Sequence, residues 1–490
     1  MKKQLITLLT LLAGFSVISA QQAAPKPCAT PAFKSEWLKR YQQNPDAFPK
    51  SNGTMYVDMT IHIMGNDAGQ GYFSIAKTLN AFCELNEDFE QADIQFIIKD
   101  ILYHDNTEYY SHQEFEPGLE MMYTYNVPNT LNCYIVDDPA GACGYSAYGI
   151  GIALQKGCIN TGDNTWAHEA GHALSLPHPF YGWEGYDHNY NLPAPAFVFG
   201  NEVERIDGSN CQNAGDGFCD TAPDYLNYRW GCDNNNNSVT SQKDPTGVSF
   251  YSDGSLFMSY SLDACSHRFS DDQIAAMRAN LLDDNVALMS ETQPDGIIDD
   301  NPVLTAVNPA QGASAPNPNE VTLQWEPVPN ATHYVLQLNP FSFFSVVVDQ
   351  FIVEGTSLTV SGLLPNRTYH WRVRPFNNIY TCTSFTNSQQ FTTGSVTSTD
   401  NPGENPALRI YPNPISKGQS LHLQIGEDMQ GQALITLYTA AGAQVWSGTP
   451  TLAKGDQIID LGIESLSSGI YLLRIIQDDR QWQSKLIIQH

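Results

Sequence analysis

The sequence predicts a multidomain chain: a first α+β domain in which helices and strands alternate, followed by two small all-β sandwiches. The 490 residues are too many for one core of ordinary size. Strand-like and helix-like stretches alternate over residues 51–285, whereas only short alternating strands follow residue 303. Two turn-rich polar stretches, 286–302 and 395–406, read as the linkers between these parts.

Residues 1–20 are typical of a secretory signal peptide. Two lysines precede the apolar run LITLLTLLAGFSVI, and Ile-Ser-Ala stands before Gln21. The run is too short and wrongly flanked for a membrane span, and no later segment is long and apolar enough to cross a bilayer. Residues 21–50 then form a short pro-segment. We therefore expect an exported chain without a membrane span.

The charge of the chain narrows the classes of partner. It carries 52 acidic and 24 basic residues, which give a formal net charge of −28. This excess of negative charge argues against nucleic acid and anionic membrane surfaces as partners. It suits a soluble protein in a salty or calcium-containing medium.

The motif HEAGHALSLPH, from His168 to His178, carries the chemistry. His168 and His172 are four residues apart, so on a helix both imidazoles project from one face toward one ion. Pro177 cannot continue the helix, and the chain turns back so that His178 becomes a third ligand. Glu169 lies beside the metal, where its carboxylate polarises a water. Three nitrogens and one open position are typical of catalytic zinc and imply hydrolysis.

A second motif, SLFMSYS, supplies a tight turn at Met258, with Tyr260 two residues on. Together with the histidines, it makes residues ~52 to 285 resemble the pappalysin family of metzincin zinc metalloproteases, in its bacterial branch. The family's other pieces come in order in the sequence: a strand (54–64), a helix (74–90), a strand (93–101), the segment GDGFCDTAPD (215–224), and CSHRFSDDQIAAMRANLL after the Met-turn.

The resemblance implies an α+β catalytic domain with a twisted mixed sheet and an active-site helix, and a role for each site residue. His168, His172 and His178 bind zinc, Glu169 is the general base, and Met258 and Tyr260 form the floor and wall of the site. Glu169 would accept a proton from the zinc-bound water during attack on a peptide carbonyl, and the Tyr260 hydroxyl would help to stabilise the oxyanion. The family's glycine before the third histidine is Ser175 here, which holds the bend if it avoids a positive φ.

The resemblance also implies a calcium-binding loop. Asp216 and Thr221, with the carbonyl of Cys219 between them, match a loop in family relatives, and oxygen ligands suit this hard cation. Asp, Thr and Gly here could equally just build turns.

The sequence says less about how substrates bind than about which residues bind the metal. We expect extended substrates along an edge strand within 144–154, paired through main-chain hydrogen bonds. Relatives that prefer a basic side chain after the scissile bond have an acidic residue where Ala264 stands, and Asp263 is one position further back. No cleavage-site preference is therefore predicted.

Ten cysteines in an exported chain are first interpreted as disulfides. Family spacing implies the first two of the following pairs, the third would clamp the loop before the active-site helix, and the fourth is a guess: Cys211–Cys219, Cys232–Cys265, Cys143–Cys158 and Cys83–Cys133. Cys28 remains. Its thiolate is a good zinc ligand that could block the open position in a latent precursor, as propeptide cysteines do in related enzymes. Alternatively, Cys28 pairs with Cys382 or lies free.

Residues 303–394 predict a β-sandwich. VTLQWEPVPNATHYVLQL and GLLPNRTYHWRVRPFN resemble the fibronectin type III signature, with Trp325, Tyr334, Tyr369 and Trp371 read as core aromatics. Such domains are usually spacers or binding modules.

Residues 407–490 predict a second small antiparallel sandwich. IYPNPISKG, a strand ending in Gly, LSSGIYLLRI and a terminal Lys-containing strand resemble the C-terminal sorting domain of type IX secretion. That resemblance implies the secretion machinery as a partner. It also implies export across the outer membrane of a Bacteroidetes-type bacterium, to the cell surface or the medium.

These patterns predict a monomeric, secreted zinc-dependent endopeptidase acting on proteins or peptides. Two other classes stay open: an exported binding or adhesion protein with a vestigial or non-proteolytic zinc domain, and a zinc hydrolase of non-peptide substrates. The intact Glu169 and all three histidines argue against the first. The long Met-turn scaffold and the exported, disulfide-tied body favour peptide bonds over the second.

Overall fold

A computed structural model describes residues 26–292, 294–318, 320–344 and 349–394. Of the C-terminal part it describes 408–411, 415–416, 421–425, 430–439, 444–459, 466, 469–477 and 480–489. The predicted signal peptide and the predicted linker 395–406 lie outside the described residues. No helix among the described residues is both long and apolar enough to span a bilayer.

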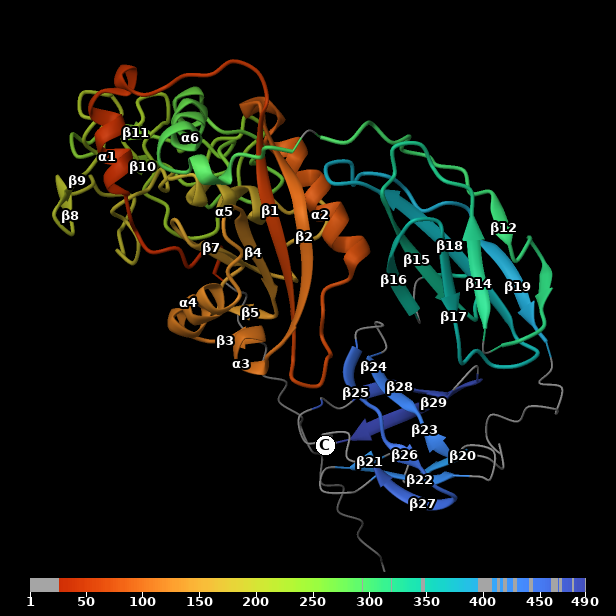
Figure 1. The fold of residues 1–490 in the computed structure, drawn as a ribbon. Coiled ribbons are helices and arrows are strands. Elements are labelled where there is room, and N and C mark those ends of the chain that lie inside the picture. Colours follow the sequence, from red (N-terminus) through yellow and green to blue (C-terminus); the bar gives the residue numbers. More distant parts are fainter. Residues whose placement is uncertain are drawn as a thin grey trace, which may run out of the picture.

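A five-stranded sheet with strand order β2-β1-β4-β7-β6 forms the centre of the first domain (Figure 1). Its strands are β1 (Met55–Gly65), β2 (Ile94–Asp105), β4 (Leu131–Val136), β6 (Gly144–Ala147) and β7 (Gly151–Gln155). Four strands are parallel and β6 runs antiparallel at the edge. Parallel central strands are covered on both faces, which explains why β1 and β4 are almost wholly buried. The predicted mixed sheet is present.

Helices cover this sheet, and the short elements lie around it. The helices are α1 (Glu36–Gln43), α2 (Ile75–Asp88), α3 (Thr107–Tyr110), α4 (Phe115–Thr124), α5 (Thr165–Ala173) and α6 (Asp271–Asp283), with 3-10 turns η1 (Pro45–Ala47), η2 (Glu90–Ala92) and η3 (Val286–Leu288). Three two-stranded ribbons are β3 (Ser111–His112) with β5 (Asp138–Pro139), β8 (Phe197–Val198) with β9 (Asn201–Glu202), and β10 (Gln242–Lys243) with β11 (Ser249–Phe250).

Helix α1 belongs to the core of the first domain, although it lies within the predicted pro-segment. Ser35 caps its N-terminus by accepting a hydrogen bond from the Leu38 amide, the expected role of Ser at that position. Trp37 and Leu38 are buried in the main core cluster, and the Trp37 indole donates to Asp283 on α6. Residues 35–43 are therefore held in the first domain by burial and hydrogen bonds.

The middle domain is a β-sandwich of a three-stranded and a five-stranded sheet. The first sheet comprises β12 (Ala306–Asn308), β14 (Val321–Trp325) and β17 (Ser357–Val360); the second comprises β13 (Ala313–Ala315), β19 (Gln389–Thr393), β18 (Thr368–Phe376), β15 (His333–Asn339) and β16 (Asp349–Glu354). Trp325, Tyr334 and Trp371 are fully buried between the sheets, so the prediction of core aromatics is confirmed. The Tyr369 hydroxyl accepts a hydrogen bond from the Leu364 amide, which is the tyrosine corner of such sandwiches.

The middle domain packs directly against the first domain. A disulfide joins Cys83 on α2 to Cys382, and the buried Arg374 of β18 donates to the Ala76 carbonyl and to Asn80 on the same helix. At the exposed edge of the sheet, the Ile98 amide of β2 donates to the Asn378 carbonyl. Figure 1 shows the middle sandwich lying beside α2 and β2.

The stretch 286–302, predicted as a linker, is packed at both ends. Met289 bridges to Val57 of β1, and Ile298 is buried in the core cluster of the middle domain. Because both ends are packed, this stretch restricts movement of one domain relative to the other.

The Cys83–Cys382 disulfide contradicts the guess that Cys83 pairs with Cys133, and also the alternative that Cys28 pairs with Cys382. Cys133 is a free thiol buried on the central strand β4, and Cys28 is free as well. The guess was wrong because it considered only partners of Cys83 within the first domain, whereas the two bonded cysteines are 299 residues apart in sequence and lie in different domains. The other three pairs are those predicted: Cys143–Cys158, Cys211–Cys219 and Cys232–Cys265.

Removing the interdomain disulfide tests how much it holds the domains together. We expect the Cys83→Ser/Cys382→Ser variant to lose about 2–4 kcal/mol of unfolding free energy, because the cross-link restrains a long stretch of unfolded chain. Guanidinium unfolding followed by tryptophan fluorescence measures the loss, and limited proteolysis should cut the variant faster between the domains. An unchanged midpoint would mean that the noncovalent contacts alone hold the domains.

The described C-terminal residues form a third β unit. One sheet contains β20 (Leu408–Tyr411), β22 (Leu421–Ile425) and β27 (Gly455–Ile459), a second contains β21 (Ile415–Ser416), β29 (Arg480–Gln489), β28 (Gly469–Gln477), β24 (Leu434–Thr439) and β25 (Gln444–Gly448), and β23 (Gly431–Gln432) pairs with β26 (Thr451–Leu452). Leu423, Ile435 and Leu473 are among the residues of its own core cluster. The predicted second sandwich is therefore present.

Candidate active site

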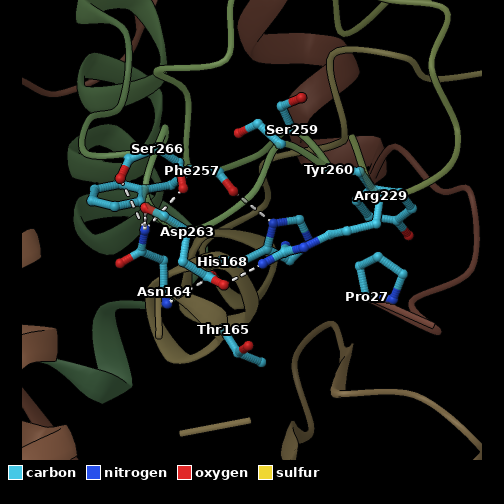
Figure 2. A pocket seen from close by; sticks show the side chains of 11 residues that line it. Pro27, Asn164, Thr165, His168, Arg229, Phe257, Ser259, Tyr260, Asp263 and Ser266 are labelled. Carbon is cyan, nitrogen blue, oxygen red and sulfur yellow. Dashed lines mark hydrogen bonds and ion pairs between the residues drawn. The ribbon is translucent and has the colours of Figure 1, made fainter. Parts of the chain in front are cut away.

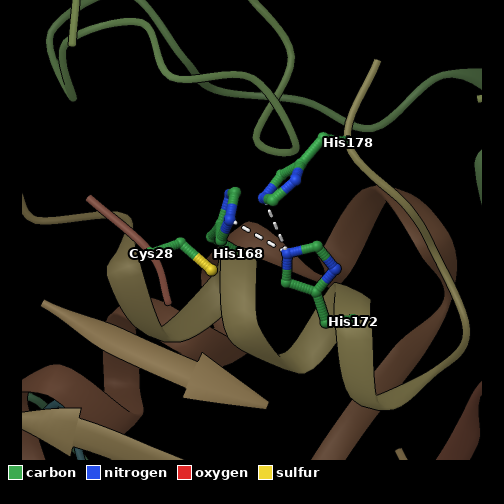
Figure 3. A group of neighbouring side chains, drawn as sticks. All are labelled: Cys28, His168, His172 and His178. Carbon is green, nitrogen blue, oxygen red and sulfur yellow. Dashed lines mark hydrogen bonds between the residues drawn. The ribbon is translucent and has the colours of Figure 1, made fainter. Parts of the chain in front are cut away.

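The three motif histidines converge on one point. Helix α5 carries His168 and His172 on one face, and the chain turns back after the helix to bring His178 opposite them (Figure 3). The Nε2 atom of His172 lies 3.2 Å from that of His168 and 3.1 Å from that of His178. All three side chains are at least 93% buried, since their exposed fractions are 7%, 6% and 2%.

The hydrogen bonds on the outer side of each ring fix which nitrogen faces inward. His168 Nδ1 lies 2.7 Å from the Phe257 carbonyl oxygen, and His172 Nδ1 lies 2.7 Å from that of Leu176. A carbonyl only accepts, so Nδ1 carries the proton and Nε2 presents a bare lone pair. His178 Nδ1 faces the Glu184 carboxylate at 3.3 Å in the same way. Three lone pairs aimed at one another repel unless a cation lies between them, so this donor set fits a zinc ion.

Burial keeps the rings of His168 and His172 neutral. It lowers the pKa of His168 to about 3 and that of His172 well below its usual value, with the neighbouring histidines adding to the effect. Neutral imidazoles are the form that binds a metal.

Glu169 lies on the same helix, and neither of its oxygens belongs to the histidine cluster. It is fully buried; one oxygen accepts a 3.0 Å hydrogen bond from the Thr30 hydroxyl, and the other has no partner among the described residues. Burial raises the pKa of Glu169 to about 8. A buried carboxyl with a free oxygen and a raised pKa is suited to take up and return a proton.

Glycines let the surrounding chain approach this helix closely. Met258 is fully buried, and a Cβ on Gly171 would lie only 2.4 Å from its sulfur. A Cβ on Gly144 of β6 would likewise meet the Glu169 side chain at 2.9 Å. Met258 therefore lies directly against the helix at Gly171, and β6 approaches Glu169 at Gly144; the sequence reasoning overlooked both glycines.

Ser175 adopts a conformation that the sequence reasoning did not expect. Its φ is 80°, in the left-handed region, whereas the sequence reasoning allowed a non-glycine residue at this bend only if it avoided a positive φ. Its hydroxyl is 2.6 Å from that of Ser35, the residue that caps α1. The contact between Ser35 and Ser175 helps to hold the turn that positions His178.

Residues 26–30, called here the N-terminal segment, lie over the histidine cluster. The Cys28 sulfur and the three histidine nitrogens all lie within 4.8 Å of one another (Figure 3). The Tyr260 hydroxyl donates a 3.1 Å hydrogen bond to the Cys28 carbonyl, and its ring centroid is 4.9 Å from that of His178. The Cys28 sulfur therefore lies at the histidine cluster, and the Tyr260 ring lies against His178; their roles as latency residue and wall of the site stay predictions.

The same segment pairs with the sheet edge where substrate binding was predicted. Lys26 exchanges main-chain hydrogen bonds with Gly141 and Cys143, and the Ala29 amide donates to the Gly144 carbonyl of β6. The Ser146 amide donates 2.8 Å to the Thr30 hydroxyl, the same hydroxyl that reaches Glu169. This edge therefore pairs with an extended chain, which here is the protein's own segment 26–30. Thr30 was missed from the sequence because a single threonine near a cysteine carries no recognisable signal.

The polar atoms of Asp216 and Thr221, in the predicted calcium loop, already take part in hydrogen bonds within the protein. Asp216 is fully buried and accepts hydrogen bonds from the Phe218 amide at 3.0 Å and the Thr221 hydroxyl at 2.9 Å. The Cys211–Cys219 disulfide closes the loop. Asp216 and Thr221 thus come together as predicted, but these contacts are also those of the turn-building alternative. The calcium site stays a prediction.

The buried carboxyls make the metal-free protein sensitive to alkali. Burial raises the pKa of Glu169 to about 8, and burial with nearby Asp216 raises that of Glu204 to about 9. Between pH 7 and 9 the folded chain thus keeps protons that the unfolded chain has lost, so stability falls as pH rises, by about 1.4 kcal/mol per pH unit for each proton. The histidines with lowered pKa values do not oppose this, because they are neutral in both states above pH 7.

We therefore expect the urea midpoint of chelator-treated protein to fall from pH 7 to pH 9. Added zinc should reduce the fall, since a cation beside Glu169 favours its ionised form. A midpoint that is constant or rises over this range, with the metal removed, would contradict the assignment of these carboxyls as buried and protonated.

Comparison with known proteins identifies the C-terminal domain. Residues 409–489 match the family described as a secretion system C-terminal sorting domain. The chain is thus a substrate of the type IX secretion machinery of Bacteroidetes, exported to the cell surface or the medium. No curated protein matches the chain.

Solved structures match the chain through fibronectin type III folds. The fn3 domain of human collagen alpha-1(XX) is 20% identical over 23% of this chain and 98% of that domain, with a TM-score of 0.16. The fn3 domain of human contactin 1 is 16% identical over 23% and 99%, with a TM-score of 0.17. These TM-scores are low, and the features that the middle sandwich has in common with such domains are its strand order and its tyrosine corner.

Proposed function

We propose that this protein is a secreted zinc-dependent endopeptidase. The observation that carries the proposal is the set of three inward-facing Nε2 lone pairs, buried beside a carboxyl that has a free oxygen. His168, His172 and His178 would hold the ion. Bound zinc would supply a Lewis acid that acidifies water and polarises a carbonyl.

The chain's own residues supply the remaining chemistry. Glu169 accepts a proton from the attacking water and returns it to the leaving amine, a task suited to its buried environment. The Tyr260 hydroxyl, freed from the Cys28 carbonyl, becomes a donor for the developing oxyanion. The edge strand β6 aligns an extended peptide through its main-chain groups. The resemblance of residues ~52 to 285 to pappalysin-family metzincins supports the same reaction class.

The N-terminal segment would keep the enzyme latent through two contacts. The Cys28 thiolate would occupy the open metal position, and the Thr30 hydroxyl ties up the carboxylate of Glu169. Residues 31–33 are exposed, between this blocking stretch and the anchored helix α1. A cut within 31–33 would release the block and leave α1 in the core.

A chain with a recognition sequence for a site-specific protease in place of residues 31–33 tests the proposal. Zinc content and digestion of casein and gelatin are measured before and after the cut. We expect digestion only after the cut, with loss on chelation and return on adding zinc. Zinc-loaded, cut protein that cleaves neither protein nor a broad peptide library would contradict the proposal.

A further inference from the structure

A cavity lies at the hairpin that joins β6 to β7, whereas Gly144, at the start of β6, lies against Glu169. The volume of the cavity is about 210 Å³, while one water needs about 10–15 Å³. The pocket beside His168, which Figure 2 shows, has only about 20 Å³ and holds about one water. Of the two, the hairpin cavity is therefore the one with room for a side chain.

The lining of this cavity is apolar at its base and polar at its mouth. Its buried and half-buried apolar lining residues are Val127, Leu131, Ala147, Ile150, Ala173 and Leu288. The lining residues Asn126, Asn129 and Asp284, by contrast, are exposed. Such a cavity suits a long side chain that has an apolar stem and a polar end.

Asp284 gives the mouth of the cavity a negative charge. Among the described residues that line the cavity, it is the one charged side chain. One of its oxygens accepts a 2.5 Å hydrogen bond from the Tyr148 hydroxyl. Within the described part of the chain, its other oxygen accepts no hydrogen bond and no lysine or arginine forms an ion pair with it. The charge of Asp284 is therefore uncompensated, unlike that of Asp263, which Arg229 neutralises.

This combination favours a basic side chain. A lysine or arginine would lay its methylene groups against the apolar base and place its cation beside the free oxygen of Asp284. An aspartate or glutamate at the same place would meet a like charge without a cation to offset it. A neutral side chain would gain the apolar contact alone.

The protein's own chain shows how an extended peptide reaches the cavity. The N-terminal segment lies along β6, and further along the same chain the centroid of the Phe33 ring is 6.4 Å from that of Tyr148 in the hairpin. The Tyr148 hydroxyl in turn reaches Asp284 at the mouth of the cavity. Phe33 is five residues after Cys28, which lies at the histidine cluster. A chain bound along this edge, with one residue at the metal, thus brings a residue about five positions away to the cavity.

We propose that the cavity at the β6–β7 hairpin is a subsite for a lysine or arginine side chain of the bound peptide, about five residues from the residue at the metal, and that Asp284 recognises the cation. The proposal rests on the proposed peptidase function, because it needs a peptide bound along β6.

Binding of the chain's own sequence as a free peptide tests the subsite without any cleavage. The protein is the full chain cut within 31–33, separated from the released fragment, loaded with zinc and carrying Glu169→Gln so that no peptide is consumed. The probes are fluorescent, C-terminally amidated peptides of residues 26–33 that differ only in Arg, Gln or Glu in place of Phe33. Fluorescence anisotropy gives the dissociation constant of each peptide.

We expect the Arg peptide to bind about fivefold tighter than the Gln peptide, and the Glu peptide to bind most weakly. Asp284→Asn should remove the difference between Arg and Gln, while its amide oxygen still accepts from the Tyr148 hydroxyl. Ala287→Trp, which fills the cavity from an exposed lining position, should remove it as well. Asp271→Asn is the matched control: it removes an exposed carboxylate at the other end of α6 and should leave the difference in place.

Cleavage mapping gives a second readout. In a proteome-derived peptide library, the cut chain with Glu169 intact should select Lys or Arg about five residues from the scissile bond, on one side of it. Because that side chain is remote from the reacting atoms, its replacement by Gln should raise KM and leave kcat unchanged.

The outcomes separate this inference from the proposed function. Cleavage without a basic preference at that distance, or with one that survives Asp284→Asn, overturns the subsite and leaves the peptidase intact. Tighter binding of the Arg peptide that depends on Asp284, without cleavage of any peptide, supports the subsite and contradicts the peptidase. Equal binding of all three peptides, or binding of none, overturns the subsite.

Discussion

Replacing Glu169 with Gln is expected to abolish most peptidase activity while zinc content stays the same. Gln has the same shape as Glu, and neither oxygen of Glu169 belongs to the histidine cluster, so the metal should remain. An amide cannot accept the proton from water, and losing a general acid–base group typically costs about 10²–10⁴-fold in rate. Activity of the cut variant on a peptide substrate, with zinc measured in the same sample, checks this.

Glu184→Gln provides a contrasting control. Glu184 accepts a hydrogen bond from His178 Nδ1 on the outer side of the ring. Its loss should therefore weaken zinc binding by His178 and leave the proton transfer by Glu169 unchanged. Loss of such an outer partner typically lowers metal affinity or activity by about 10–100-fold. Added zinc should restore most activity to Glu184→Gln and none to Glu169→Gln. Equal rescue of both variants would contradict the assignment of Glu169 as the base.

Replacing Cys28 with Ser is expected to make the uncut chain active. A neutral hydroxyl is a poor zinc ligand beside a thiolate, so the open metal position should no longer be blocked. The backbone contacts with β6 and the Thr30–Glu169 hydrogen bond remain, and adding Thr30→Val should raise the activity of the uncut chain further. The measurement is peptide hydrolysis by each uncut protein, relative to the same protein after the cut.

Cys133→Ala is the matched control for this experiment. Cys133 is the other free, buried cysteine, but it lies on the central strand β4 rather than in the N-terminal segment. Its replacement should leave the uncut chain latent. If Cys28→Ser stays as inactive as the parent before the cut, the thiol is not what blocks the site.

Sequence could predict the parts of the site that local geometry determines. Helix geometry alone places His168 and His172 on one face, and Pro177 ends the helix before His178. Both sandwiches followed from hydrophobic periodicity, which depends on neighbours along the chain, whereas the mixed sheet was implied by the family resemblance.

The parts that failed or were missed depend on residues distant in sequence. The Cys83 partner lies in another domain, 299 residues away, where no spacing rule applies. The positive φ of Ser175 is held by a contact with Ser35, and the partner of Glu169 is Thr30 on the N-terminal segment. The ion pair that neutralises Asp263 comes from Arg229, outside both motifs. Such contacts are determined by tertiary packing, which periodicity does not report.

Zinc content tests the central claim most directly. The full chain is purified, dialysed against zinc-free buffer, and analysed by elemental mass spectrometry beside His172→Ala, with circular dichroism to show that both are folded. The proposed site predicts stoichiometric zinc in the parent and its loss in the variant. A folded parent that carries no zinc and takes none up would contradict the claim.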